Sequence, residues 1–495
     1  PLGFLRVVAS DRYNWKFESE PEPGLNNRRL EIPRGKTLGG SSSINALMYI
    51  RGNAMDYNLW RQQGCDGWGY EDVLPYFKKL ETSWRGENEF HGASGPVRTE
   101  PVDFPDMLFD DFRRAAEAAG IPYNNDPNGA VQDGFARMEQ NTGDGRRTST
   151  ARAYLSPAMG RANLVIETGA LSSKIIVENN RAKGVDYIQN GQRKTAYADG
   201  EVIVCGGSFN SPHLLMLSGI GPADHLRDMN IPVVHDMPGV GQNLSEHANM
   251  LSVQGVRDDL GLTRQLRVDR ATGGVLQWLF KQGGAFSTNG AVCHSFLRTR
   301  DNLVRPDVQI VHMTLSNRGS LWVPGMTKKP QWCFSARVGG PLSPLSRGWV
   351  KLRSADPAAK PRIQYNMFTE REDMDTMIRA LRMSREIYAQ SPIADYITHE
   401  IEPGSAVQSD ADLEANIRAN ATHRSHPCGT CKMGIDDLAV VDPQLRVHGL
   451  EGLRIADASI MPEVIAGNTN TPCMMIGEKA ADLVRGKLAA QVAGA

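Results

Sequence analysis

The stretch EVIVCGGSFNSPHLLMLSGIGP, residues 201–222, decides the fold class of this chain. Its apolar, β-branched start predicts a buried strand, and Gly206-Gly207 predicts the turn that follows. We expect a helix to open near Ser211-Pro212 and to stop at Gly219, because proline suits a first helical turn and glycine a helix end. A strand, a glycine turn and a helix in succession indicate an α/β protein.

The sequence on either side of this stretch extends the pattern. Residues 163–200 alternate short β-rich runs with turn residues, which predicts a small antiparallel sheet. Near the end of the chain, a short apolar strand from Leu453 to Ala456 precedes another turn and another helix. The part from Gly449 onward is therefore expected to rejoin the α/β region.

The middle of the chain differs in composition. Residues 307–313 and 349–354 are predicted strands, and residues 246–424 are expected to form a second, α+β region that interrupts the first. Five apolar residues share one face of a predicted helix, a spacing that is typical of core packing. They are Met374, Met377, Ile378, Leu381 and Tyr388.

An N-terminal segment rich in glycine and serine, PRGKTLGGSSSINALMYIRG, covers residues 33–52. It predicts a glycine turn, a serine cluster able to cap a helix, and the start of an apolar helix. Backbone N–H groups at such a helix start can lie against a phosphate or a planar ring.

Length and charge exclude several classes of protein. The 495 residues are enough for two or three domains, and the net charge of −1 comes without a block of like charges. A nucleic-acid partner or an anionic membrane surface is therefore not expected. No apolar run reaches the length of about 18–20 residues that a membrane span needs, and the start lacks the pattern of a signal peptide. We expect a cytoplasmic protein without an integral membrane segment.

The chain has seven cysteines, which is an odd number, and they are scattered along the sequence. Both facts argue against a disulfide framework. Cys428 and Cys431 form a CxxC motif, but zinc would need two more suitably spaced ligands, and His423 and His426 crowd the same turn. A thioredoxin-like motif should open a helix after a strand, whereas this one lies in a Gly/Pro turn. We expect two small buried thiols and no metal site.

Two turns near the C-terminus combine a base with an amide. The sequence HPCGTCKMG begins at His426, and GNTNTP at 467–472 contains Asn468 and Asn470. A histidine of near-neutral pKa beside an amide suits removal of a proton from a hydroxyl group. The electrons then need an acceptor. A serine hydrolase is disfavoured, because neither GGSSS at 39–43 nor GGSFN at 206–210 supplies the closing glycine of GxSxG.

The motifs together resemble the glucose–methanol–choline (GMC) family of flavin oxidoreductases. PRGKTLGGSSSINALMYIRG, CGGSFNSPHLLMLSGIGP, PGVGQNLSEH, SRGWVKLRSADP and HPCGTCKMG…LRIADASIMP…NTNTP occur in family order over nearly the whole chain. Among its members, the chain is most similar to bacterial choline-dehydrogenase-like alcohol dehydrogenases.

This resemblance implies an α/β FAD-binding domain of Rossmann-like type interleaved with an α+β substrate-binding domain that contains an antiparallel sheet. The FAD-binding domain would comprise residues 1–55, 150–245 and 425–495, and the substrate-binding domain residues 56–149 and 246–424.

The resemblance also implies the function, which is oxidation of a primary alcohol to an aldehyde by hydride transfer to flavin N5. His426 would be the catalytic base and Asn468 the second active-site residue. Oxygen or a quinone would accept the electrons, and a quinone-linked enzyme could be peripheral to a membrane. The expected FAD-binding residues are Leu38, Gly40, Asn45, Ala46, Leu47, Ser172, Asp457, Ala458, Asn470 and Thr471.

Two departures from the family pattern concern histidines. Some members attach flavin covalently through a histidine where this chain has Ile44, so FAD is expected to be noncovalent. A histidine that assists in some members follows a PDxQxH pattern, but here His312 is shifted by one residue, which turns a strand side chain to the other face. His312 is therefore only a weak candidate. The nine remaining histidines, His247 and His213 among them, are expected to be structural.

A third departure concerns the glycine-rich turn that holds the dinucleotide. No GxGxxG occurs in the sequence, and PGVGQNL lacks the third glycine. We expect the first βαβ unit of the FAD-binding domain to be absent from this chain. The alternative function is accordingly a flavin-free remnant, or a binding protein that keeps the fold.

The sequence does not identify the alcohol substrate. A choline site would need a carboxylate and aromatic rings around the ammonium group. Trp278, Trp322 and Trp332 are the candidates for such rings.

Overall fold

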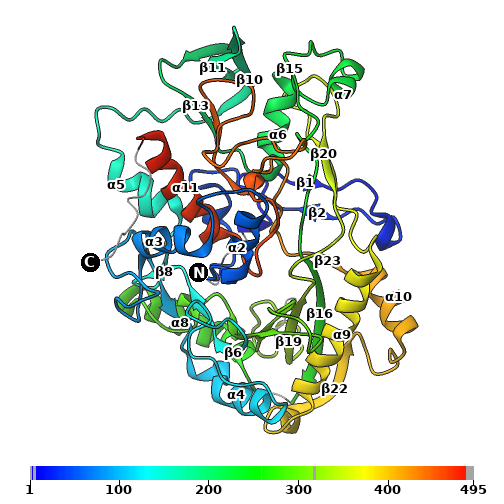
Figure 1. Ribbon diagram of the computed structural model, residues 1–495. Helices are drawn as coiled ribbons and strands as arrows, with labels where there is room; N and C mark the ends of the chain where they lie inside the picture. The colour runs from blue at the N-terminus through cyan, green and yellow to red at the C-terminus, as the bar shows by residue number, and fades with distance from the viewer. Residues whose placement is uncertain (1–2, 4–6, 258, 316–318, 487–495) are drawn as a thin grey trace.

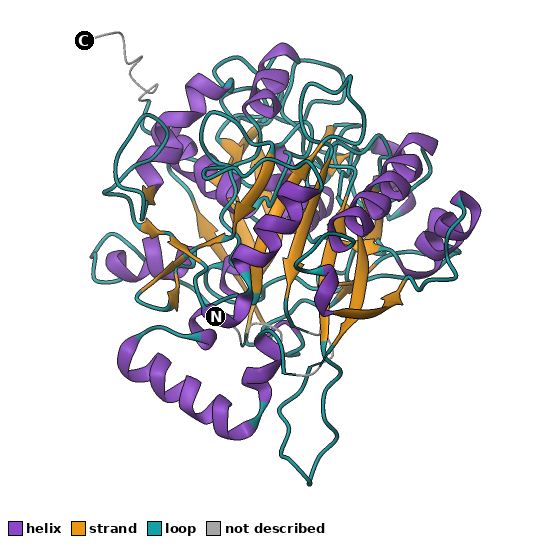
Figure 2. Ribbon diagram, turned by 90° about the horizontal axis from the view of Figure 1, so that it is seen from below, coloured by secondary structure: helices purple, strands orange, loops and turns teal. Residues whose placement is uncertain are grey.

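The computed structural model describes residues 3, 7–257, 259–315 and 319–486 of the chain. A large antiparallel sheet with its covering helices lies toward the bottom of Figure 1, and the smaller sheets around α6 lie toward the top. Seen from below in Figure 2, strands occupy the middle of the molecule and helices surround them. This is a mixed α/β architecture with a large antiparallel sheet, as the sequence predicts.

The large sheet has seven strands, all antiparallel. Along the sheet the order is β22-β16-β19-β18-β17-β6, and β23 pairs with β16. The strands are β22 Ile397–Glu402, β16 Ala248–Val256, β19 Cys333–Gly339, β18 Val308–Met313, β17 Ala291–Leu297, β6 Gly134–Arg137 and β23 Thr422–His423.

One face of this sheet packs against α4 (Phe109–Ala118) and α9 (Arg371–Tyr388). The five apolar residues predicted to line one helical face all lie on α9 and are all buried, which confirms that interpretation. Burial of each large apolar side chain contributes about 1.5–3 kcal/mol. The opposite face of the sheet is thereby left free to line a cavity.

A parallel strand pair carries the strand–turn–helix unit. Strand β13 (Val202–Val204) pairs with β24 (Leu453–Ile455), so the segments after both strands lie at the same edge. The following helix, α6 (Gly207–Leu217), begins four residues earlier than predicted and contains Pro212 in its interior. Asp457, which follows β24, accepts hydrogen bonds from the Gly207 N–H (2.9 Å) and from the Ser211 hydroxyl (2.5 Å). This distant carboxylate holds the first helical turn, and no local signal could have revealed it.

The small antiparallel sheet predicted within residues 163–200 is present. It consists of β10 (Ala170–Glu178), β11 (Arg181–Gln189) and β12 (Gln192–Tyr197). The predicted end of α6 at Gly219 is also confirmed, because that glycine has a left-handed φ of +81° directly after the helix.

The helix predicted to start within residues 33–52 is absent. The serine cluster forms only a short 3-10 turn, η2 (Gly40–Ser43), and Leu47 has a left-handed φ of +67°. Arg147 removes the acceptors that a helix would use. Its guanidinium donates to the Ser42 carbonyl (3.0 Å), to the Asn45 side chain (2.7 Å) and to the Asn45 carbonyl (2.6 Å).

The C-terminal helix α11 (Asn470–Val484) packs against α3 (Tyr70–Leu80). Among the described residues, no helix has both the length and the apolar character needed to cross a bilayer. The domain boundaries given above remain a prediction.

The remaining elements are short or peripheral. The helices are α2 Ala54–Gln62, α5 Ser156–Ala158, α7 Ala223–Asp228, α8 Val268–Lys281 and α10 Asp410–Asn420. The strands are β1 Phe17–Glu18, β2 Glu31–Ile32, β3 Glu81–Thr82, β4 Val97–Arg98, β5 Glu100–Pro101, β7 Glu139–Gln140, β8 Thr142–Gly143, β9 Arg146–Arg147, β14 Ile220–Gly221, β15 His235–Asp236, β20 Trp349–Lys351 and β21 Arg362–Gln364.

Candidate active site

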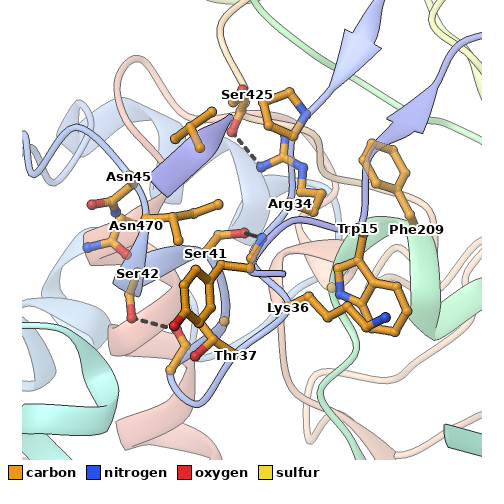
Figure 3. Close-up of a pocket in the computed structure, with 18 of the residues that line it drawn as sticks. Trp15, Arg34, Lys36, Thr37, Ser41, Ser42, Asn45, Phe209, Ser425 and Asn470 are labelled. Carbon is orange, nitrogen blue, oxygen red and sulfur yellow. Dashed lines mark hydrogen bonds between the residues drawn. The ribbon is translucent and has the colours of Figure 1, made fainter. Parts of the chain in front are cut away.

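A cavity of about 2340 Å³ opens between the large sheet and the parallel strand pair. Small-molecule pockets usually hold about 300–1,000 Å³, so this cavity has room for a cofactor and a substrate together. Figure 3 shows Asn45 and Asn470 on one side of it, and Trp15 and Phe209 on the other.

His426 lies in the cavity wall and is only 7% exposed. The preceding residue, Ser425, has a left-handed φ of +68°, which turns the chain sharply before the histidine. The His426 backbone N–H donates to both carboxyl oxygens of Glu246, at 2.8 and 2.9 Å. The backbone of the base is thus anchored by a buried carboxyl group on the neighbouring segment.

Hydrogen bonds determine which ring nitrogen of His426 carries the proton. His247 Nε2 lies 3.0 Å from the Leu342 carbonyl, which can only accept, so His247 is protonated at Nε2. His247 Nδ1 is then an acceptor, and His426 Nδ1, 3.0 Å away, must donate to it. His426 Nε2 is left unprotonated, with its lone pair available as a base.

Burial keeps both rings neutral. It lowers the pKa of His426 well below the ordinary value of 6.5, and the neighbouring His247, Arg424 and Arg34 act in the same direction. Burial and Arg424 likewise lower the pKa of His247 to about 3. Burial raises the pKa of Glu246 to about 8. Arg34 and the backbone N–H groups that donate hydrogen bonds to this carboxyl act in the opposite direction. At neutral pH, His426 is therefore ready to accept a proton.

Asn468 lies directly beside the base. Its amide nitrogen is 3.0 Å from His426 Nε2, to which it donates, while its carbonyl oxygen Oδ1 is buried and has no partner among the described residues. A buried amide oxygen without a partner is costly. The Nε2 lone pair and the amide therefore meet at the cavity wall, where the hydroxyl of a ligand would take the place of the hydrogen bond between them.

Nine of the ten residues predicted to bind the cofactor line this cavity. Thr471 is the exception, because it is fully buried in the first turn of α11 and its hydroxyl has no described partner. The nine are Leu38, Gly40, Asn45, Ala46, Leu47, Ser172, Asp457, Ala458 and Asn470.

Backbone groups at the cavity wall suit an anionic or phosphate-bearing ligand. Helices α6 and α11 both begin at the cavity, and neither has a side-chain hydrogen bond at its N-cap. The first N–H groups of α11 are left to meet negative charge, whereas the Gly207 N–H of α6 already donates to Asp457. A Cβ atom added at Gly40 or Gly207 would meet nothing within 4 Å, so a ligand can approach the backbone closely at both.

Four side chains considered as site candidates lie outside the cavity wall. His312 does not line the cavity, because its ring is buried on the opposite face of the sheet against Phe112, Phe135 and Tyr388. The one-residue shift therefore did turn this side chain away, and His312 is structural. Trp278, Trp322 and Trp332 do not line the cavity either.

The CxxC thiols behave as expected. Cys428 and Cys431 are both buried and free. Among the described residues, no group of His, Cys, Asp and Glu could hold a metal ion.

The sequence patterns did not reveal two residues of the site, nor the arginine that fixes one of its loops. His247 was expected to be structural but contacts His426 directly, and His213 lines the cavity with a buried, unpartnered Nε2. Arg147 fixes the Asn45 loop from a segment about a hundred residues away. No short-range sequence pattern marks these contacts, since each depends on tertiary pairing.

Comparison with known proteins gives a consistent result. The GMC oxidoreductase family profile matches residues 7–249 and 344–477. An oxygen-dependent choline dehydrogenase of Rhizobium johnstonii is 45% identical over 98% of this chain and 88% of its own length. A mitochondrial choline dehydrogenase of Mus musculus is 42% identical over 98% of this chain and 81% of its own.

Solved structures show the same fold. Pyridoxine 4-oxidase from Mesorbium loti superposes with a TM-score of 0.86 at 27% identity, over 98% of this chain and 91% of that one. A formate oxidase variant of Aspergillus oryzae superposes with a TM-score of 0.90 at 25% identity, over 98% and 90% of the two chains.

Proposed function

This chain belongs to the GMC oxidoreductase family, and we propose that it oxidises a primary alcohol to an aldehyde with noncovalent FAD, His426 acting as the base. It is a choline-dehydrogenase-like flavoprotein oxidoreductase that acts on CH–OH donors. The structural observation that carries the proposal is the chain of hydrogen bonds from the Leu342 carbonyl through His247 to His426. This chain places the ring proton of His426 on Nδ1 and leaves Nε2 unprotonated at the cavity.

The residues around the cavity fit FAD. The first N–H groups of α11 and the open space above Gly40 and Gly207 suit its phosphates and its flat ring. The nine cavity-lining residues named above would hold it, and Ile44, also in the wall, offers no atom for a covalent link. When bound, FAD supplies the acceptor for the hydride that leaves the alcohol carbon.

The chain's own residues handle the proton. His426 Nε2 takes the proton from the substrate hydroxyl, and His247 Nδ1 accepts a hydrogen bond from the imidazolium that results. The Asn468 amide, which donates to His426 Nε2 when no substrate is present, then donates to the substrate oxygen as negative charge develops there. Glu246 keeps the histidine backbone in place during this exchange.

Oxygen is the electron acceptor that the oxygen-dependent choline dehydrogenase of Rhizobium johnstonii supports, and a quinone is the alternative. Turnover in air, compared with turnover in the absence of oxygen with an artificial quinone, distinguishes the two.

The proposal is tested with the purified chain and added FAD. Bound oxidised flavin is yellow, so a visible absorption spectrum after removal of free FAD reports binding. Acid precipitation should release the flavin into the supernatant, since no covalent link is expected. A panel of primary alcohols, assayed with an artificial electron acceptor, should then show aldehyde formation. A colourless protein, or a yellow one that oxidises no alcohol, would overturn the proposal.

A further inference from the structure

The cavity face of the large sheet carries two arginine side chains that form no ion pair with any described residue. Arg337 lies on β19, and Arg424 follows β23 and lies across Gly339, where an added Cβ would overlap its guanidinium. Arg424 Nη1 donates to the Gln309 carbonyl at 3.1 Å. Among the described residues, Arg337 makes no hydrogen bond, and neither arginine has an ion pair.

The two cations affect each other. Burial first and Arg337 second lower the pKa of Arg424 to about 9, against the opposing effect of Glu246, and burial lowers the pKa of Arg337. Two neighbouring, largely buried cations at the wall of a cavity are unfavourable unless an anion lies between or beside them. Glu246 is the nearby carboxyl group, but backbone N–H groups of His247 and His426 already occupy it.

A third polar group completes the cluster. Asn249 on β16 pairs with Gly339 in the sheet, lines the cavity and is 2% exposed. Neither its amide nitrogen nor its amide oxygen has a partner among the described residues. A buried, unsatisfied amide aimed at a cavity indicates a ligand that supplies the missing hydrogen bonds.

The acidic residues of the cavity wall lie elsewhere. The two that line it are Glu167 and Asp457. Asp457 is held by Gly207, Ser211 and Ser459, and Glu167 accepts from Gln189 beside the three-stranded sheet. A quaternary ammonium group would therefore meet two arginines at the sheet and no carboxylate.

We propose that the alcohol substrate carries an anionic oxygen group, a carboxylate in the simplest case, and that Arg337, Arg424 and Asn249 bind it. This proposal rests on the proposed function, because it assigns the substrate class of the same site. Two guanidinium forks and an amide donor match the planar geometry of a carboxylate. The specificity of the enzyme then differs from that of the choline dehydrogenases to which it is similar.

Three alcohols that differ in charge test the assignment on the FAD-loaded enzyme. They are a terminal hydroxy acid (hydroxypropanoate and its longer unbranched homologues), choline, and dimethylbutanol as the neutral carbon isostere of choline. We expect kcat/KM for the best hydroxy acid to exceed that for choline and for the neutral alcohol by about 10- to 100-fold, the effect of a charge-assisted hydrogen bond. A preference for choline or for the neutral isostere would overturn the proposal.

Variants locate the effect. Arg337→Met should lower the ratio of kcat/KM for the hydroxy acid to kcat/KM for the neutral alcohol by about 10- to 100-fold, and Arg337→Lys should lower it less because lysine keeps the charge without the fork. Arg193→Met, on the exposed strand β12, removes the same charge from a position outside the cavity wall and should not change this ratio. Loss of flavin from Arg337→Met would instead assign the residue to the cofactor and refute the proposal.

A binding measurement separates this proposal from the proposed function. Butanoate has no hydroxyl to oxidise, so calorimetric titration of the FAD-loaded enzyme reports the anion site alone. We expect butanoate to bind, and to bind about 10- to 100-fold more weakly to Arg337→Met. Binding of butanoate without oxidation of any alcohol would refute the proposed function but support the anion site. Alcohol oxidation without butanoate binding would support the proposed function and refute the anion site.

Discussion

Replacement of His247 by phenylalanine tests the proton arrangement at the base. His247 Nδ1 accepts the Nδ1 proton of His426 at 3.0 Å, and His247 is itself fixed by the Leu342 carbonyl. Phenylalanine keeps a planar ring but removes the acceptor, so the His426 proton is no longer held on the side away from the cavity. Both rings are neutral, so the substitution changes no net charge.

The size of the effect follows from the change in His426 during the reaction. As a neutral ring, His426 loses a hydrogen bond of about 0.5–1.5 kcal/mol, whereas as an imidazolium it loses one of about 1.5–3 kcal/mol. The difference of about 1–2 kcal/mol falls on the transition state, which corresponds to a decrease in kcat of about 5- to 30-fold. A shift of the proton to Nε2 would add to this loss.

His247→Gln is the matched control, since its carbonyl can accept from His426 and its amide can donate to Leu342. We expect it to recover most of the activity. Flavin absorbance per protein and the melting temperature must be measured for both variants, because phenylalanine leaves the Leu342 carbonyl unpaired. A phenylalanine variant with full flavin content and the kcat of the unsubstituted enzyme would refute the assigned proton positions.

Three further results are expected. Asn468→Ala should raise the activation free energy by about 2–4 kcal/mol, as for loss of one oxyanion donor, measured from kcat at full flavin content. Arg147→Lys should weaken FAD binding about tenfold, measured by fluorescence of released flavin on dilution, because lysine cannot hold both Asn45 acceptors and the Ser42 carbonyl. Urea unfolding at a series of pH values should show stability falling as the pH drops below about 6.5, because buried histidines with lowered pKa values contribute fully above that value and must take up protons below it. These are His213, His247, His294, His312, His423 and His426.

The contribution of Glu246 to the free energy of unfolding changes with pH in the opposite direction. Its pKa is raised to about 8, so its contribution to stability is complete below its ordinary value of 4.5 and is lost as the pH rises through 8. Glu246→Gln should therefore flatten the alkaline side of the stability profile while leaving the acid side in place.

Local patterns predicted the regular elements well. The stripe from Met374 to Tyr388 is buried on α9, and the strand beginning at Leu453 pairs in parallel with β13. Apolar periodicity and glycine turns determine these features over a few residues, so they can be read without knowledge of the fold. The same holds for Cys428 and Cys431, which are free and buried as predicted.

The errors arose where distant groups decide local structure. Arg147 takes the carbonyls of Ser42 and Asn45, so the apolar segment after the serines does not continue as a helix. Asp457 binds Gly207 and Ser211, so α6 begins before the proline that seemed to open it. His247 joins the base only because the sheet brings residues 247 and 426 together.

The central claim is that His426 removes the proton while bound FAD takes the electrons from an alcohol. The most direct measurement is the rate at which the visible flavin absorbance bleaches when alcohol is mixed anaerobically with the FAD-loaded enzyme. We predict that His426→Ala retains its flavin and bleaches at least about a hundredfold more slowly than the unsubstituted enzyme, the usual contribution of a positioned base. Equal bleaching rates at equal flavin content would contradict the account.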